Sequence, residues 1–129
     1  MNIRIEGVTK SYGGQRVLDA LSLAVHEGEL LTLLGASGSG KTTLLRILAG
    51  LERADAGRVV FGDTVVQDDT AFVSPQRRGL GMVFQSYALW PHLDVAGNLA
   101  LALHEQGMPK PQITERVDEA LVTVGLAGM

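Results

Sequence analysis

The sequence contains no cysteine, which excludes disulfide bonds and thiolate metal sites. Its 11 lysines and arginines do not outnumber its 14 acidic residues, so it lacks the basic excess of a nucleic-acid-binding surface. The densest apolar stretch, "LLTLLGA", is far shorter than the roughly 18 to 20 residues of a membrane span. The start, "MNIRIEG", has no apolar core of a secretory signal. We therefore expect a soluble chain that meets a membrane only through a partner.

The composition is that of a folded domain. Of the 129 residues, 46% are hydrophobic and 19% are charged, which suits a packed core and argues against a solvated, disordered tail. We expect one α/β domain, in which antiparallel strands come first, a strand–loop–helix unit follows, and helices end the chain.

Apolar patterns predict four strands outside the hairpin described next. Residues 3–8 and 21–25 contain alternating apolar residues, and "HEGE" after the second segment is typical of a turn. The continuous apolar run "LLTLLG" predicts a central parallel strand, because such strands are buried on both faces. "LGMVFQ" predicts a further strand.

The stretch "RVVFGDTVVQ" predicts a hairpin, with Gly62 and Asp63 as its two-residue turn. The polar stretch "DDTAFVSPQRRG" that follows predicts a loop. We expect Arg77 and Arg78 in this loop to be a solvated pair.

Apolar residues at helical spacing predict three helices. The first follows residues 35–43, the second begins at Asp94 as its N-cap and ends before Gly107, and the third ends at Gly125. The apolar faces expected for them are, in order, Leu44, Leu45, Leu48 and Leu51; Val95, Leu99 and Leu103; and Ile113, Val117, Leu121 and Val124.

The stretch "GASGSGKTT", residues 35–43, fits the phosphate-loop pattern G-x-x-x-x-G-K-[ST]. Its glycines permit a backbone that turns N–H groups inward as an anion nest, and the following helix offers its positive end to phosphate. Lys41 would supply a point charge to the β- and γ-phosphates, the Thr42 hydroxyl would ligate Mg²⁺, and Thr43 would reach the α-phosphate. The residues expected to bind the nucleotide here are Gly35, Ala36, Ser37, Gly38, Ser39, Gly40, Lys41, Thr42 and Thr43.

Three stretches together resemble the ATPase subunit of ABC transporters. They are "VTKSYGG" near the start, "GASGSGKTTLLRILAGLE" around the phosphate loop, and "GMVFQSYALWPHLDVAGNL". The hairpin lies between the second and third stretches, as it does in that family, and the resemblance covers essentially the whole chain. The phosphate loop is shared by many NTPases, so the combination of the three is the specific signal.

The resemblance implies roles for three residues outside the phosphate loop. Tyr12 would stack on adenine, and Val17 would pack on the same ring. Gln85 would join the shell of Mg²⁺ and attacking water and link it to the membrane subunit, which makes Lys41 and Gln85 the expected catalytic residues. The residues alone leave alternatives open: Tyr12 as a turn residue, Val17 as strand core and Gln85 as a surface residue.

The same resemblance implies a P-loop NTPase core with an N-terminal antiparallel β subdomain, truncated before the Walker B strand, and an incomplete helical subdomain. Within one domain of residues 1–129, the expected parts are antiparallel strands at 1–33 and 57–72, the phosphate loop and helix at 34–56, the Q-loop strand and loop at 80–93, and the start of the helical subdomain at 94–129.

Three family motifs are missing from the sequence. No "SGG" of the signature occurs, no acid after Gln85 follows four apolar residues as in a Walker B strand, and the last histidine, His104, lies inside a predicted helix. Hydrolysis needs a residue that orients or deprotonates water. We therefore expect the chain to bind ATP and Mg²⁺ without hydrolysing ATP, as the N-terminal part of a longer ATPase.

By resemblance, the expected function is to power a solute importer from the inner face of the cell membrane. The expected partners are transmembrane permease subunits, contacted through the loop from Gln85 to Asp94, and a second ATPase subunit; no nucleic acid is expected. Trp90, the only tryptophan, lies in this loop, which the residues alone would also allow to fold back onto the core. A non-catalytic nucleotide-binding or regulatory module is the alternative function, whereas a small kinase leaves the first and third stretches unexplained.

Overall fold

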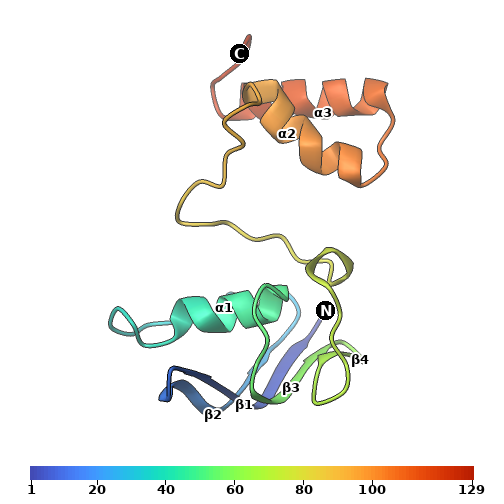
Figure 1. Cartoon of the computed structure of the whole chain (residues 1–129). Helices are drawn as coiled ribbons and strands as arrows, with labels where there is room; N and C mark the ends of the chain where they lie inside the picture. The colour runs from blue at the N-terminus through green and yellow to red at the C-terminus, as the bar shows by residue number, and fades with distance from the viewer. The chain divides into compact units, whose positions relative to one another are not determined.

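The computed structural model describes all 129 residues, as two compact units, Met1–Met82 and Val83–Met129 (Figure 1). The first unit contains a four-stranded sheet and one α-helix, and the second contains two helices. The chain is an α/β protein with an antiparallel sheet, in agreement with the fold class expected from the sequence. None of its helices combines the length and apolarity that crossing a membrane requires.

The sheet has the strand order β2-β1-β3-β4, and each neighbouring pair is antiparallel. Its strands are β1 (Ile3–Tyr12), β2 (Gln15–Val25), β3 (Ala56–Phe61) and β4 (Thr64–Gln67). The expected hairpin is confirmed, because Phe61 pairs with Thr64 and leaves Gly62 and Asp63 as the turn. The loop after β4 contains a short 3-10 helix, η1 (Pro75–Arg77).

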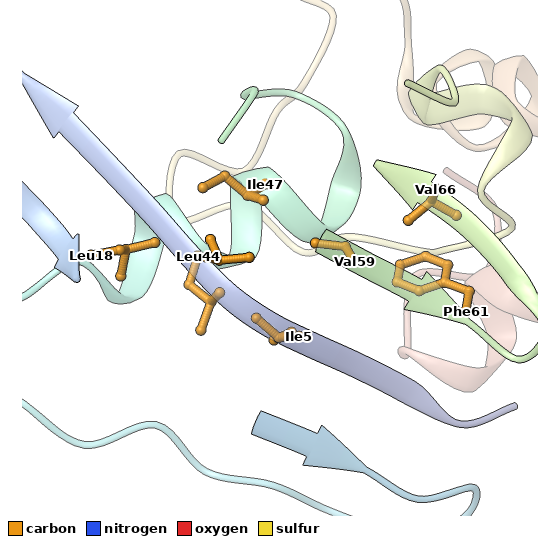
Figure 2. Close-up of a cluster of buried hydrophobic side chains, with 8 residues drawn as sticks. Ile5, Leu18, Leu44, Ile47, Val59, Phe61 and Val66 are labelled. Carbon is orange, nitrogen blue, oxygen red and sulfur yellow. The ribbon is translucent and has the colours of Figure 1, made fainter. Parts of the chain in front are cut away.

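The helix α1 (Lys41–Ala49) lies across one face of this sheet and closes the core of the first unit. Leu44 and Ile47 from α1 belong to one buried cluster that also contains apolar side chains of all four strands (Figure 2). Burying each such side chain contributes about 1.5 to 3 kcal/mol. The apolar face expected for this helix was wrong in part. Leu45 and Leu51 are 48% and 42% exposed, whereas Ile47, which was not expected on this face, is fully buried.

Two strands expected from the sequence are absent from the structure. The segments "LLTLLG" at 30–35 and "LGMVFQ" at 80–85 form no strand, and Leu30 and Val83 are 93% and 98% exposed. A strand exists only through hydrogen bonds to a neighbour, and neither segment pairs with any strand of the sheet. The prediction of buried strands is therefore wrong for the structure of these 129 residues, which contains no parallel sheet to bury the two segments.

Arg78 is not part of a solvated pair. Arg77 is exposed, as expected, whereas Arg78 is only 4% exposed. Its guanidinium donates hydrogen bonds to the backbone carbonyls of Val73, Ile47, Leu48 and Val66 at 2.8, 2.9, 3.1 and 3.3 Å. It therefore joins the end of α1 to the hairpin and the following loop.

The second unit is a pair of packed helices, α2 (Val95–Glu105) and α3 (Lys110–Thr123). Ile113, Val117 and Leu121 are buried, as expected, but Val124 follows the helix and is 66% exposed. The face of α2 differs from the expected one: its residues packed on α3 are Ala96, Ala100 and Leu103, whereas Val95 and Leu99 are exposed. Small alanines let the two helices approach closely. The sequence analysis assigned the larger apolar residues to this face instead and so missed the alanines.

The N-cap of α2 is confirmed, because Asp94 Oδ1 accepts a hydrogen bond from the Gly97 N–H at 2.7 Å. We expect Asp94→Ala to destabilise the α2–α3 pair by about 1 kcal/mol, the usual value of such a cap. Faster hydrogen exchange at the Gly97 and Asn98 amides would measure this loss. Asp118→Ala, an exposed acid inside α3, is the control; equal effects of the two changes would contradict a capping role.

Candidate functional site

The side chain of Lys41, the first residue of α1, lies against the loop that precedes the helix. Its Nζ donates hydrogen bonds to the carbonyls of Gly35 and Ala36 at 2.6 and 2.7 Å, and to Ser39 Oγ at 3.0 Å. No carboxylate forms an ion pair with Lys41. These hydrogen bonds curve the loop around the ammonium, and no acid neutralises the positive charge of this group.

Two glycines make this curve possible. Gly40 has φ 92°, and a β-carbon there would lie 2.6 Å from the Val17 carbonyl oxygen. A β-carbon on Gly35 would lie 2.6 Å from Ser39 Oγ. A side chain at position 40 would therefore push the loop away from β2, and one at position 35 would displace the Ser39 side chain, so both positions favour glycine.

The loop ends in unpaired donors at the start of α1. No side chain caps this helix, its first turn carries no acid, and the backbone N–H groups of Lys41, Thr42 and Thr43 donate to no atom of the chain. Free N–H groups and the helix dipole give this end a partial positive charge. The donors, the ammonium and the lack of an acid in the first turn fit a phosphate group, and the hydroxyl of the exposed Thr42 fits a metal ligand beside it.

The two residues expected to contact the base lie at the ends of β1 and β2. Tyr12 is the last residue of β1 and is 45% exposed. Val17 is the extra residue of a β-bulge in β2, since Lys10 pairs with Leu18 and Ser11 with Arg16. Bulges often redirect a side chain beside an active site. Val17 also packs on the core, in agreement with the strand-core interpretation.

A pocket of about 310 Å³ lies between β2 and the phosphate loop. Val17, Leu33, Ser39, Gly40 and Lys41 are among its lining residues. The pocket places Val17 next to the loop, which brings two of the sequence-predicted site elements together.

Three charged residues near Tyr12 were missed by the sequence analysis. Lys10 Nζ lies 3.0 Å from Glu52 Oε1 and 3.3 Å from Asp55 Oδ1. Burial lowers the pKa of Lys10, but hydrogen bonds and charges from the two carboxylates outweigh it and raise this pKa. The hydrogen bond from Lys10 is the main cause that lowers the pKa of Glu52, with a smaller contribution from the Tyr12 hydroxyl. No sequence signal joins residues this far apart, because the sheet alone brings them together.

In the second unit, Gln85 is exposed in the loop before α2. Leu89 and Trp90 in the same loop are 69% and 53% exposed. Tyr87 and Ala88 have φ of 61° and 51°, a left-handed conformation that costs free energy in residues other than glycine. The loop thus presents apolar side chains on a strained backbone.

Asn98 organises this loop and was also missed from the sequence. Its Oδ1 accepts a hydrogen bond from the Trp90 N–H at 2.8 Å, and its Nδ2 donates to the carbonyls of Trp90, Leu93 and Asp94. Asparagine is an unfavourable residue inside a helix. Its position one turn after the Asp94 cap is the signal that could have identified it.

Comparison with known proteins decides the family. A family model described as "ABC transporter" matches residues 18–129, which is most of the chain. The chain belongs to the ABC transporter family. The matched region contains two of the three stretches that carried the resemblance, the phosphate loop and the loop with Gln85, whereas Tyr12 and Val17 lie before it.

Known members of the ABC transporter family similar to this chain are ATP-binding proteins of import systems. The spermidine/putrescine import ATP-binding protein of Marinobacter nauticus is 45% identical over 96% of this chain and 32% of its own length. A putative 2-aminoethylphosphonate import ATP-binding protein of Salmonella typhimurium is 47% identical over 97% and 33%. The sulfate/thiosulfate import ATP-binding protein of Xanthomonas campestris is 47% identical over 100% and 38%. The chain spans about a third of the length of these curated relatives.

Proposed function

We propose that this chain binds Mg-ATP on the loop Gly35–Thr43 and serves as the nucleotide-binding part of an ATPase subunit of an ABC importer. The observation that carries the proposal is the position of the Lys41 ammonium, which donates hydrogen bonds to the loop carbonyls and is not neutralised by any acid. The neighbouring free N–H groups and the names of the relatives, all import ATP-binding proteins, support it further.

Each site residue has a place in this proposal. The triphosphate lies on the phosphate loop, the adenine stacks on Tyr12, and Val17 packs at the edge of the base. Thr42 and Gln85 contribute oxygen ligands to the metal. When bound, Mg²⁺ supplies positive charge that offsets the charge of the phosphate oxygens.

In the whole protein, we propose that two such subunits hydrolyse ATP and pass the resulting movement to transmembrane permease subunits. The apolar, exposed loop from Gln85 to Asp94, held by Asn98, suits a contact with such a partner. This role places the protein in the cytoplasm, peripheral at the inner face of the cell membrane. In such systems, other subunits set the transported solute.

A non-catalytic nucleotide-binding module is the second candidate for the chain by itself. It is favoured by the position of the acids after Gln85: Asp118 and Glu119 lie exposed within α3 rather than at the end of a strand, where a base for water would be expected. Mg-ATP binding without phosphate release would support this candidate. Steady ATP turnover by the purified chain would overturn it in favour of an active ATPase.

The proposed function is tested by comparing two ligands, Mg-ATP and Mg-tripolyphosphate, in equilibrium binding measurements. The first carries a base, and the second carries phosphates alone. We expect both to bind, and we expect Tyr12→Ala to weaken Mg-ATP binding about tenfold, the usual value of one aromatic–base stack. Binding of tripolyphosphate should be unchanged.

Tyr12→Phe is the matched control, because it keeps the aromatic ring and should keep most of the affinity for ATP. If the wild-type chain bound neither ligand, the proposed function would be wrong. If Tyr12→Ala weakened both ligands equally, the ring would not be the base-binding surface.

A further inference from the structure

Lys10 lies beside the ring that the proposed function assigns to the base. Its Nζ is over the Tyr12 ring, 5.1 Å from the ring centroid. The two residues are two positions apart on β1, so their side chains leave the same side of the strand. The Lys10 side chain is only 12% exposed, an unusual degree of burial for a lysine.

The charge of Lys10 is already neutralised, which distinguishes it from Lys41. Two carboxylates, Glu52 and Asp55, lie within ion-pair distance of its ammonium. One ammonium between two carboxylates forms a group with a net negative charge, and such a group does not attract phosphate. Lys41 is therefore the lysine that suits phosphate, and the position of Lys10 beside the Tyr12 ring needs another explanation.

Both carboxylates are held by the backbone around them. Asp55 Oδ2 accepts a hydrogen bond from the Ser11 N–H at 2.7 Å, and the Asp55 N–H donates to the Thr9 carbonyl at 2.9 Å. The Glu52 N–H donates to the Arg46 carbonyl at 3.2 Å, in the last turn of α1. The ammonium is thus fixed between the end of the phosphate-binding helix and the strand that carries Tyr12.

The geometry points to Lys10 as a positioning residue for the base: its ammonium, held by Glu52 and Asp55, occupies one face of the Tyr12 ring and leaves only the opposite face for adenine. A cation over an aromatic face is attracted by the π electrons, so the contact fixes the orientation of the ring. The Lys10–Glu52 pair also ties the orientation of this ring to the far end of α1. The inference rests on the proposed function, since it assumes that Tyr12 contacts the base.

The test measures the affinities of Lys10→Met for Mg-ATP and for Mg-tripolyphosphate. Methionine keeps the length of the side chain and removes the charge. We expect ATP binding to weaken about two- to fivefold, the value of a cation–π contact to a ring that is itself half exposed, and tripolyphosphate binding to stay unchanged. A residue that merely supported the fold would weaken both ligands together, so the ratio of the two affinities separates the roles.

Three further variants sharpen the result. Lys10→Arg should keep the ATP affinity, because a guanidinium also lies well over an aromatic face. Glu52→Gln should weaken ATP binding in the same direction as Lys10→Met, since it releases one side of the ammonium. In a Tyr12→Ala background, Lys10→Met should have no further effect on ATP binding, as expected of residues that act as one unit.

Lys110→Met is the matched control, because Lys110 is exposed at the start of α3 and should have no effect on either ligand. Equal weakening of both ligands by Lys10→Met, or no weakening of ATP binding, would overturn the inference while the phosphate site stands. An effect of Lys10→Met that persists in the Tyr12→Ala background would also overturn it. Failure of the wild-type chain to bind either ligand would overturn the proposed function itself, and the inference with it.

Discussion

Arg78→Met is expected to lower the free energy of unfolding of the first unit by about 3 kcal/mol. The guanidinium of Arg78 is buried and donates to four backbone carbonyls. Hydrogen bonds from charged groups are worth more than neutral ones, and removing this donor leaves buried carbonyls without a partner. The effect is therefore expected to be much larger than that of an ordinary surface arginine.

The surroundings of Arg78 explain how a buried positive charge is tolerated without a carboxylate. No acid pairs with it, and burial lowers the pKa of its guanidinium. Two of its acceptors, the carbonyls of Ile47 and Leu48, lie at the end of α1, where the helix dipole is negative. The centroid of the Phe72 ring lies 5.0 Å from the guanidinium carbon, which adds a cation–π contact.

Arg77→Met is the control for this prediction, because the neighbouring arginine is exposed and should change stability by less than about 0.5 kcal/mol. Arg78→Lys should lose most of the stabilisation, since a single ammonium cannot reach carbonyls on three sides. Urea unfolding followed by circular dichroism measures all three variants. Equal losses from Arg77→Met and Arg78→Met would contradict the anchoring role.

Local signals in the sequence predicted the elements that depend on nearby residues. The turn at Gly62 and Asp63, the Asp94 cap and the helix after the phosphate loop each rest on a few adjacent residues, and the structure confirms all three. The glycine and lysine positions of the phosphate loop were likewise specified by a contiguous motif.

The features that the sequence did not predict depend on residues far apart in the chain. Arg78 is buried because α1 and the hairpin offer it carbonyls, and nothing in "QRRG" distinguishes it from Arg77. Lys10 meets Glu52 and Asp55 only because β1 and the start of β3 lie side by side. For the segments 30–35 and 80–85, the sequence predicted strands that the structure does not contain. Their composition is that of buried strands, but no partner strand pairs with them.

Lys41→Ala is expected to weaken the binding of both Mg-ATP and Mg-tripolyphosphate by about 10- to 100-fold, the value of one charge-assisted contact to phosphate. Lys41 is the lysine of the loop, and its ammonium is not neutralised by any acid. Loss of its charge removes attraction to the phosphates and not to the base. Lys41 therefore differs from Tyr12 and Lys10, whose substitution should affect ATP alone.

Lys41 also holds the loop carbonyls, so its loss could act through the shape of the loop rather than through charge. Lys41→Gln separates the two effects, because its amide is neutral but can still donate hydrogen bonds to the loop carbonyls. If charge is decisive, Lys41→Gln should bind both ligands as weakly as Lys41→Ala, and raising the salt concentration should weaken the wild type more than either variant. Lys110→Ala should leave both affinities unchanged. Wild-type affinity of Lys41→Gln for tripolyphosphate would show instead that the charge is not needed, and Lys41 would then act only through its hydrogen bonds to the loop.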